Sequence, residues 1–293
     1  MDISTHPALL VTALLLAPAT VAGVALLVGV RRSPERLAGA LGAAGVVLGY
    51  VVGHAASLDR LPTLPPASSN ESLGFAALIV GIGALVAARV ERVALRWTVI
   101  GLFQVAATAL LLRTQLGTLG PAALALHVAV AFGGAATVAL ASERFGERTR
   151  GPGAPLLLWA AVTACAGCIA LTGSAKYAQF GASLAAVLGA AAVVGVLVRQ
   201  ARFAGGTSNF AVAQLALLAL AATQFSELPL DAGAALALAP LAPALLPART
   251  LAARTPVARW SLLALSLALP LGYALWRCWQ VHSASAASSY YGT

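Results

Sequence analysis

Charged residues are scarce in this chain. Only 9% of its 293 residues are Asp, Glu, Lys or Arg, whereas a soluble globular domain carries about a quarter. Hydrophobic residues make up 60%, and the mean hydropathy is +0.90. This composition excludes a water-soluble surface, and no extended polar stretch remains for a second, soluble domain.

Recognisable enzyme motifs are also missing. The sequence contains no H-E-x-x-H, no G-x-S-x-G, no glycine-rich phosphate loop and no paired acidic motif. An enzyme is therefore not the favoured interpretation, although a site assembled from separate polar residues would leave no motif.

Long apolar runs recur along the whole chain, and each is long enough to cross a hydrocarbon core of about 30 Å. We therefore predict an all-α, polytopic transmembrane helix bundle of about ten spans. A single transmembrane domain is expected over residues 1–281, followed by a disordered outer tail at 282–293. The predicted spans lie near 9–30, 37–57, 73–88, 95–112, 119–141, 154–172, 179–198, 210–225, 232–247 and 260–276. The eighth and ninth spans have an alternative, because Pro229, Pro240, Pro243 and Pro247 are compatible with a kinked or re-entrant pair.

The net charge of +9 would suggest nucleic-acid binding in a soluble protein, but here the cations lie between apolar runs. Of the 18 Lys and Arg residues, 14 fall in turns on one side of the predicted bundle. These are Arg31, Arg32, Arg36, Arg89, Arg92, Arg96, Arg144, Arg148, Arg150, Arg199, Arg202, Arg249, Arg254 and Arg259. By the positive-inside rule that side is cytoplasmic, so both termini are predicted to lie outside. The expected partner is the lipid bilayer of the plasma membrane, and no nucleic acid is expected.

The N-terminal segment is predicted to be the first span and not a cleaved signal peptide. Asp2 and the lack of a cation before the first apolar run argue against a signal peptide.

No Asp, Glu, Lys or Arg lies well inside a predicted span. Ion-coupled carriers and proton pumps usually keep such a group within the membrane, so that mechanism is disfavoured. The best single candidate for a functional residue is His127, placed about eight residues from the outer end of the fifth span and hence roughly 12 Å deep. We expect it to face the bundle interior with a hydrogen-bond acceptor, a ligand or water within reach.

His54 lies near the outer end of the second span. Two histidines on different helices are the minimum for haem ligation, so His54 and His127 could hold a haem or chlorin. The alternative is that each is a neutral side chain bonded to a neighbouring carbonyl.

Further polar side chains gather toward the outer half of the predicted bundle. With the two histidines they form the predicted ligand-binding set, whose other members are Gln104, Lys176, Gln224, Glu227 and Asp231. Gln104 lies near the centre of its span and must find a partner, because an unpaired amide in hydrocarbon is costly. The alternative is that these residues only join helices to one another.

The chain has three cysteines. Cys165 and Cys168 lie at i and i+3 of one predicted helix, and Cys278 lies near the outer end of the last. A membrane disulfide exchanger would use such thiols, but an apolar environment disfavours the reactive thiolate. Cys165 and Cys168 are therefore predicted to be reduced and structural.

Two patterns concern packing. Small residues recur at helical spacing at Gly39, Gly42 and Gly45 and between Gly181 and Gly189, which predicts close helix approach. Arg-Trp pairs at 96–97 and 259–260 open two spans, so spans 2–4 and 8–10 could be parallel repeats. Ordinary interfacial anchoring explains the same pairs.

The function that these features favour is a small permease-like protein that moves an uncharged or weakly charged solute through an outer vestibule. The alternative is a non-catalytic subunit that packs against other membrane subunits, as a structural component or as the holder of a pigment or haem.

Overall fold

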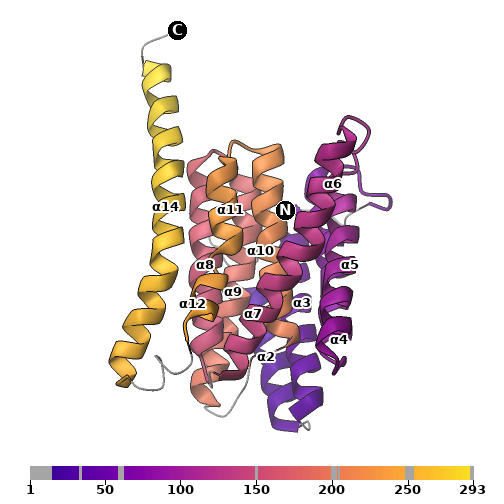
Figure 1. Cartoon of the computed structure of the whole chain (residues 1–293), viewed down its shortest axis with the longest axis vertical. Coiled ribbons are helices and arrows are strands. Elements are labelled where there is room, and N and C mark those ends of the chain that lie inside the picture. Colours follow the sequence, from indigo (N-terminus) through magenta and orange to yellow (C-terminus); the bar gives the residue numbers. More distant parts are fainter. Residues whose placement is uncertain are drawn as a thin grey trace.

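The computed structural model describes residues 15–32, 35–58, 63–148, 151–198, 203, 205–247 and 254–290, and within these ranges every regular element is helical (Figure 1). The helices are α2 (Ala17–Arg32), α3 (Glu35–Leu58), α4 (Ser69–Ala87), α5 (Val93–Leu111), α6 (Pro121–Ala129), the π-helical η3 (Val130–Gly134), α7 (Ala135–Arg148), α8 (Gly153–Leu171), α9 (Ala175–Leu197), α10 (Gly206–Phe225), α11 (Leu230–Leu238), α12 (Leu241–Leu245) and α14 (Pro256–Tyr290).

Eight helical segments of the described chain are long and apolar enough to cross a membrane. They are Ala40–Leu58, Ser69–Ala87, Val93–Leu111, Pro121–Gly146, Gly153–Leu171, Ala175–Leu197, Gly206–Phe225 and Val257–Ala284. The chain is therefore an all-helical, multi-pass integral membrane protein. These eight are fewer than the roughly ten spans expected; the predicted spans without a counterpart among them are the first, which lies only partly within the described residues, and the ninth.

Of the first predicted span, the structure describes the part from residue 15 onward, where the apolar part of α2 covers Ala17–Val28. Its predicted beginning, at residues 9–14, lies outside the described residues.

The ninth predicted span, 232–247, is broken into α11 and α12. Pro240 and Pro243 explain the break, because proline donates no backbone hydrogen bond and its ring clashes with the preceding turn. Together α11 and α12 still lead from the upper end of the bundle toward its lower end in Figure 1. The counterpart of this segment in the predicted repeat, α4, is continuous, so the structure gives the repeat no support.

Helix α10 lies at the centre of the bundle. It packs against α3, α4, α5, α7, α8, α9 and α11, and most of its residues are buried. Around it, buried apolar side chains from nearly all the other helices form one continuous hydrophobic core.

Glycines allow unusually close packing of α3. A Cβ atom at Gly49 would lie 2.7 Å from the Pro18 carbonyl oxygen of α2, and one at Gly53 would lie 2.7 Å from Ser183 of α9. Gly181 likewise lets α9 approach Ala166 of α8. These contacts extend the small-residue face predicted at Gly45 by two further turns of α3.

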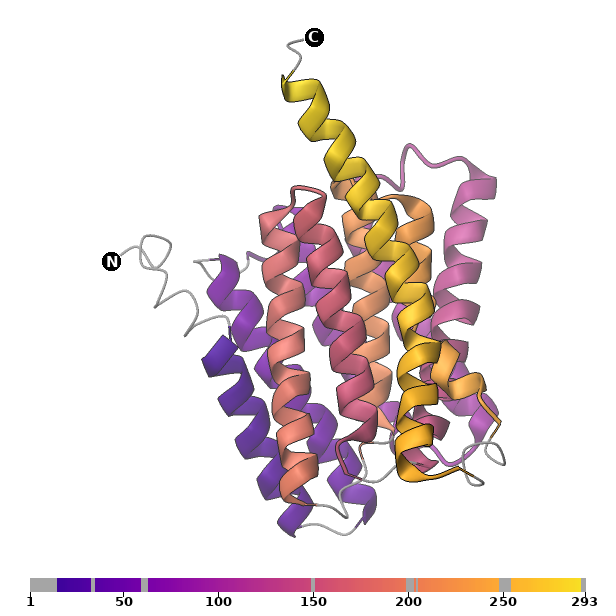
Figure 2. The same cartoon turned by 90° about the vertical axis from the view of Figure 1, so that its left-hand side faces the viewer.

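Helix α14 lies at the edge of the bundle, against α8, α11 and α12, and projects beyond the other helices (Figures 1 and 2). Residues 282–290, which were predicted to be disordered, continue this helix. Residues 291–293 lie outside the described part.

The helix ends that flank the cation-rich turns lie at the same, lower end of the bundle in Figure 1. This is the alternation that the charge pattern predicts. That this end faces the cytoplasm stays a prediction.

Candidate polar site in the bundle core

The structure distributes the predicted ligand-binding residues over four places. His54 and Lys176 lie close together at the upper ends of α3 and α9, whereas Gln104 lies in the bundle core. His127 is on α6, and Gln224, Glu227 and Asp231 lie where α10 leads into α11. The predicted outer vestibule is therefore not lined by one convergent set.

His54 is buried and fully engaged by the protein. Its ring stacks on Phe180 with 4.0 Å between the ring centroids, and its Nε2 lies 3.0 Å from the carbonyl oxygen of Asn70. Its Nδ1 lies 3.5 Å from the Tyr50 hydroxyl. Both ring nitrogens thus have protein partners, which leaves neither free for haem iron.

Polar contacts near His54 join three helix ends. The Lys176 ammonium donates to the carbonyl oxygen of Ser57, near the end of α3, and the Tyr177 hydroxyl donates to Ser69 Oγ, 2.9 Å away. Glu71 is fully buried in the first turn of α4, where its Oε2 accepts hydrogen bonds from Thr63 Oγ1 and the Ala67 N–H, each 2.8 Å long. Lys176 therefore acts here as a helix-joining residue.

His127 has a different environment from the one predicted. Helix α6 contributes no buried residue, and His127 is half-buried. Its Nδ1 lies 2.7 Å from the Ala123 carbonyl oxygen of its own helix. The expected acceptor is present, but it comes from the preceding turn and not from another helix.

Asp231 connects α11 to α14. Its Oδ2 accepts hydrogen bonds from the Tyr273 hydroxyl (2.6 Å) and from Arg277 Nε (2.7 Å). These bonds, the one from Tyr273 first, hold the pKa of Asp231 below its ordinary value. Gln224 is half-buried and Glu227 is exposed.

Gln104 opens onto a small cavity between α4, α5 and α10. The cavity, of about 10 Å³, has about the room that one water molecule needs. Gln104 and Asn209 both line it, and both side-chain carbonyl oxygens are buried without a hydrogen-bond partner. The lining of this cavity therefore includes two residues whose side-chain acceptors are not used within the described part of the protein.

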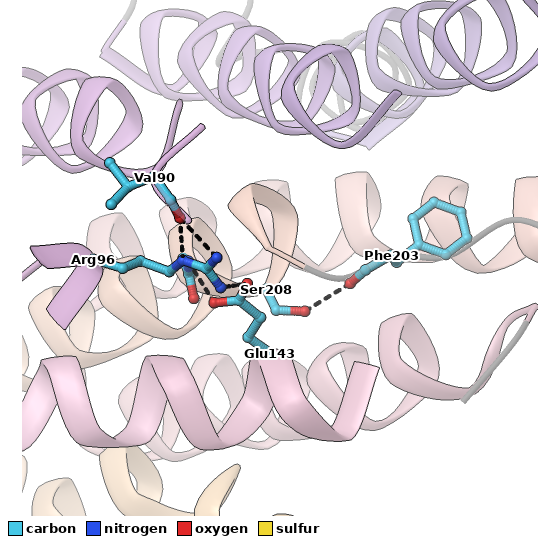
Figure 3. Close-up of polar contacts among 6 residues, drawn as sticks. Val90, Arg96, Glu143, Phe203 and Ser208 are labelled. Atoms are coloured by element: carbon cyan, nitrogen blue, oxygen red, sulfur yellow. Dashed lines mark hydrogen bonds and ion pairs between the residues drawn. The ribbon is translucent and has the colours of Figure 1, made fainter. Parts of the chain in front are cut away.

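An ion pair joins Arg96, near the start of α5, to Glu143 of α7 (Figure 3). Arg96 Nη1 contacts Glu143 Oε1 at 2.5 Å, and the same guanidinium donates through Nε and Nη2 to the Val90 carbonyl oxygen. Glu143 Oε2 also accepts a hydrogen bond of 3.4 Å from Asn209 Nδ2. That bond fixes the orientation of the Asn209 amide, so its oxygen must point away from the carboxylate.

A second set of buried polar residues lies between the level of this cavity and His54, on a different face of α10. Gln214 lies five residues after Asn209 on α10, and its Nε2 donates to the Tyr50 hydroxyl, 2.8 Å away. Tyr50 in turn faces His54 Nδ1. We call the whole series the central polar line; its members are Glu143, Asn209, Gln104, Gln214, Tyr50 and His54.

A second cavity of about 10 Å³ lies beside the break between α11 and α12, where Pro240, Pro243 and Ser142 line it. The buried Ser142 hydroxyl has no hydrogen-bond partner. Ser142 precedes Glu143, so this cavity lies close to the lower end of the central polar line.

Four members of the line, Tyr50, Glu143, Asn209 and Gln214, were not among the predicted site residues. Glu143 was assigned to a cytoplasmic turn because it follows the predicted end of its span at residue 141. One feature of the sequence could have pointed to Glu143: it and Arg96 have opposite charges and lie at span ends on the same predicted side of the membrane, so they could form an ion pair. The structure corrects the assignment of Glu143 to a turn: α7 continues to Arg148 and the apolar span to Gly146, so Glu143 lies within a helix. Both side chains of the ion pair are largely buried.

Among the described residues, no group of three His, Cys, Asp or Glu side chains is arranged to hold a metal ion. No protein-family model matches the chain, and neither a curated protein nor a solved structure resembles it significantly. The function must therefore be argued from the geometry of the bundle.

Proposed function

We propose that this chain is a permease-like membrane protein that moves a small, uncharged or weakly charged solute along the central polar line. The observation that supports this proposal is the presence of two sets of buried polar groups around the central helix α10: Glu143, Asn209 and Gln104 beside the cavity, and Gln214, Tyr50 and His54 nearer the upper end of α3. Polar groups within a membrane are costly, and where they persist they usually mark a pathway or a binding site.

The chemistry of the line favours a solute without net charge. The charge of Glu143 is balanced by Arg96, and the remaining members are amides, a phenol and an imidazole. These groups offer both hydrogen-bond donors and acceptors to a passing molecule. The free oxygens of Gln104 and Asn209 would bind it through its own donor groups.

The cavity at Gln104 holds only about one water molecule, so transport requires helices to separate. Two irregular segments interrupt otherwise regular helices, and we expect the helices to move relative to each other there. One is the break between α11 and α12, and the other is the π-helical η3 between α6 and α7. Carriers often use broken helices at their binding sites, and π segments often accompany function.

The test is solute entry into liposomes that contain the purified protein, with a panel of small neutral and weakly charged solutes. We expect flux above that of empty liposomes for at least one solute. Asn209→Leu should reduce this flux at least ~10-fold, a change of about 1.4 kcal/mol in the barrier. Gln280→Leu, on the exposed part of α14, is the matched control and should leave the flux unchanged. No flux for any solute, or equal flux in both variants, would contradict the proposal.

The second candidate, a non-catalytic subunit of a larger membrane complex, is favoured by the exposed face of α14. Trp260, Trp276 and Trp279 on this helix are each at least 42% exposed. Such aromatic residues are enriched at protein interfaces as well as at lipid headgroups. Stoichiometric copurification of other membrane proteins, lost when all three Trp residues are changed to Ala, would support this candidate. A stable single chain with no copurifying protein would argue against it.

A further inference from the structure

All three cysteines of the chain are buried free thiols, and they gather where α14 meets α8. Cys165 and Cys168 lie on α8, and Cys278 lies on α14. Cys278 and the pair Cys165 and Cys168, which are more than a hundred residues apart in the sequence, thus share one helix contact at the edge of the bundle.

The register of the two helices brings Cys168 and Cys278 together. Both helices run toward the upper end of the bundle in Figure 2, and His282 Nδ1 lies 3.1 Å from the Leu171 carbonyl oxygen. One turn back from this contact on each helix lie Cys168 and Cys278. Both thiols are buried in the contact between the two helices, close enough to interact with each other.

We propose that Cys168 and Cys278 are a site of reversible disulfide formation that fastens α14 to α8. Cys165 stays outside the bond, because it lies nearly a full turn farther from the Leu171–His282 contact. This proposal does not depend on the transport function.

The reaction is a thiol–disulfide exchange with an external disulfide. One thiolate attacks the oxidant's disulfide, and the mixed disulfide is then displaced by the second thiolate. The two cysteines lose two protons and two electrons, and the oxidant leaves as two thiols. The pair lies about one helical turn, roughly 5 Å, from the end of α8. In the predicted orientation that end faces the non-cytoplasmic side, where disulfides persist.

Helix α14 is the element that such a bond would affect most. At this end of the bundle it is otherwise held by Asp231, through Tyr273 and Arg277, and by the His282 contact. A disulfide would enclose α9 to α12 in a covalent loop and keep α14 against α8 and α11.

The experiment oxidises the full chain in membranes with diamide, blocks the remaining thiols with N-ethylmaleimide and digests the protein with trypsin. Cleavage after Arg150, Lys176 and Arg277 gives the peptide 151–176, which carries both Cys165 and Cys168, and the peptide 278–293, which carries Cys278; fragmentation of the linked pair shows which cysteine of the first peptide is alkylated. We expect these peptides to be disulfide-linked, with Cys165 alkylated, and the link to disappear on reduction. The Cys165→Ala variant should still form the link.

Three outcomes would overturn the proposal: full alkylation of Cys168 and Cys278 after oxidation, a bond that includes Cys165 in the unmodified chain, or loss of the link in Cys165→Ala. A second measurement follows α14 directly. Oxidation should raise the thermal unfolding midpoint by roughly 2 °C or more in the unmodified chain. It should not do so in Cys278→Ser, and an equal rise in both would also contradict the proposal.

Discussion

At the scale of single residues, the two histidines of the predicted spans, His54 and His127, have different environments. His54 is 2% exposed, stacks on Phe180 and bonds the carbonyl of Asn70 at the start of α4. Among the described residues, the ring of His127 bonds only to a carbonyl of its own helix, in a segment with no buried residue. The same residue type thus has a packing role in one place and a local role in the other.

Changing each histidine to glutamine should separate these roles. His54→Gln loses the ring contact with Phe180 in a site that Gly74 keeps tight, so we expect a destabilisation of about 1–3 kcal/mol. His127→Gln should change the unfolding free energy by less than ~0.5 kcal/mol. Denaturant unfolding in detergent measures both, and an equal effect of the two changes would contradict this assignment.

The position of His127 along its span was readable from the sequence, but the direction of its side chain was not. Leu124, Leu126 and Val128 surround it, so the helix is apolar on all sides and no face is marked as interior. Gln104 was correctly identified as a core residue, but its cavity depends on Asn209 of α10. Which helices meet is decided by packing between segments more than a hundred residues apart, and a single sequence does not contain that information.

Among the elements, α5 and α7 are joined by the Arg96–Glu143 ion pair. Glu143 is 6% exposed at its side chain, so removal of Arg96 takes a cation away from a largely buried carboxylate. Arg96→Leu should therefore cost about 3–5 kcal/mol. The double variant Arg96→Leu with Glu143→Leu should be less destabilised than Arg96→Leu alone. Unfolding measurements on the set decide this, and purely additive losses would be inconsistent with a coupled pair.

The α2–α3 contact depends on glycines with no space for a side chain. Gly49→Ala would place a Cβ atom 2.7 Å from a backbone oxygen, so we expect a loss of about 1–3 kcal/mol. Gly167→Ala on α8 is the matched control, because no atom lies within 4 Å of its Cβ position. It should be neutral or slightly stabilising, since alanine favours helix. A comparable loss at both positions in a thermal unfolding assay would refute the close-packing explanation.

Most helices were predictable as elements. The span predicted at 154–172 is observed at Gly153–Leu171, because Gly151, Pro152 and Gly173 mark its two ends. The ninth span was not predicted as broken, since residues 232–247 have the same apolar composition whether the helix is continuous or interrupted. Its prolines were the only sign, and proline is tolerated inside α14 at Pro270.

At the scale of the whole molecule, the charge pattern predicts which end of the bundle faces the cytoplasm. Thr255, before α14, and Thr114, after α5, are both exposed and lie at opposite ends of the bundle. In a chain whose native cysteines are replaced by alanine, Thr255→Cys should react with a membrane-impermeant thiol reagent only from the cytoplasmic side. Thr114→Cys should react only from the outside. The reverse pattern would invert the predicted topology.

The central claim is that the polar line through α10 is a route for solute. Its most direct test is the access of a small water-soluble thiol reagent to a cysteine that replaces Ala213, which lines the Gln104 cavity. The comparison is Ala161→Cys, a fully buried position in the hydrophobic core on α8. Both are made in the chain without native cysteines, and reactivity is followed in membranes. We predict that Ala213→Cys reacts faster than Ala161→Cys and is protected by a transported solute; equal, unprotected reactivity at the two positions would contradict the route.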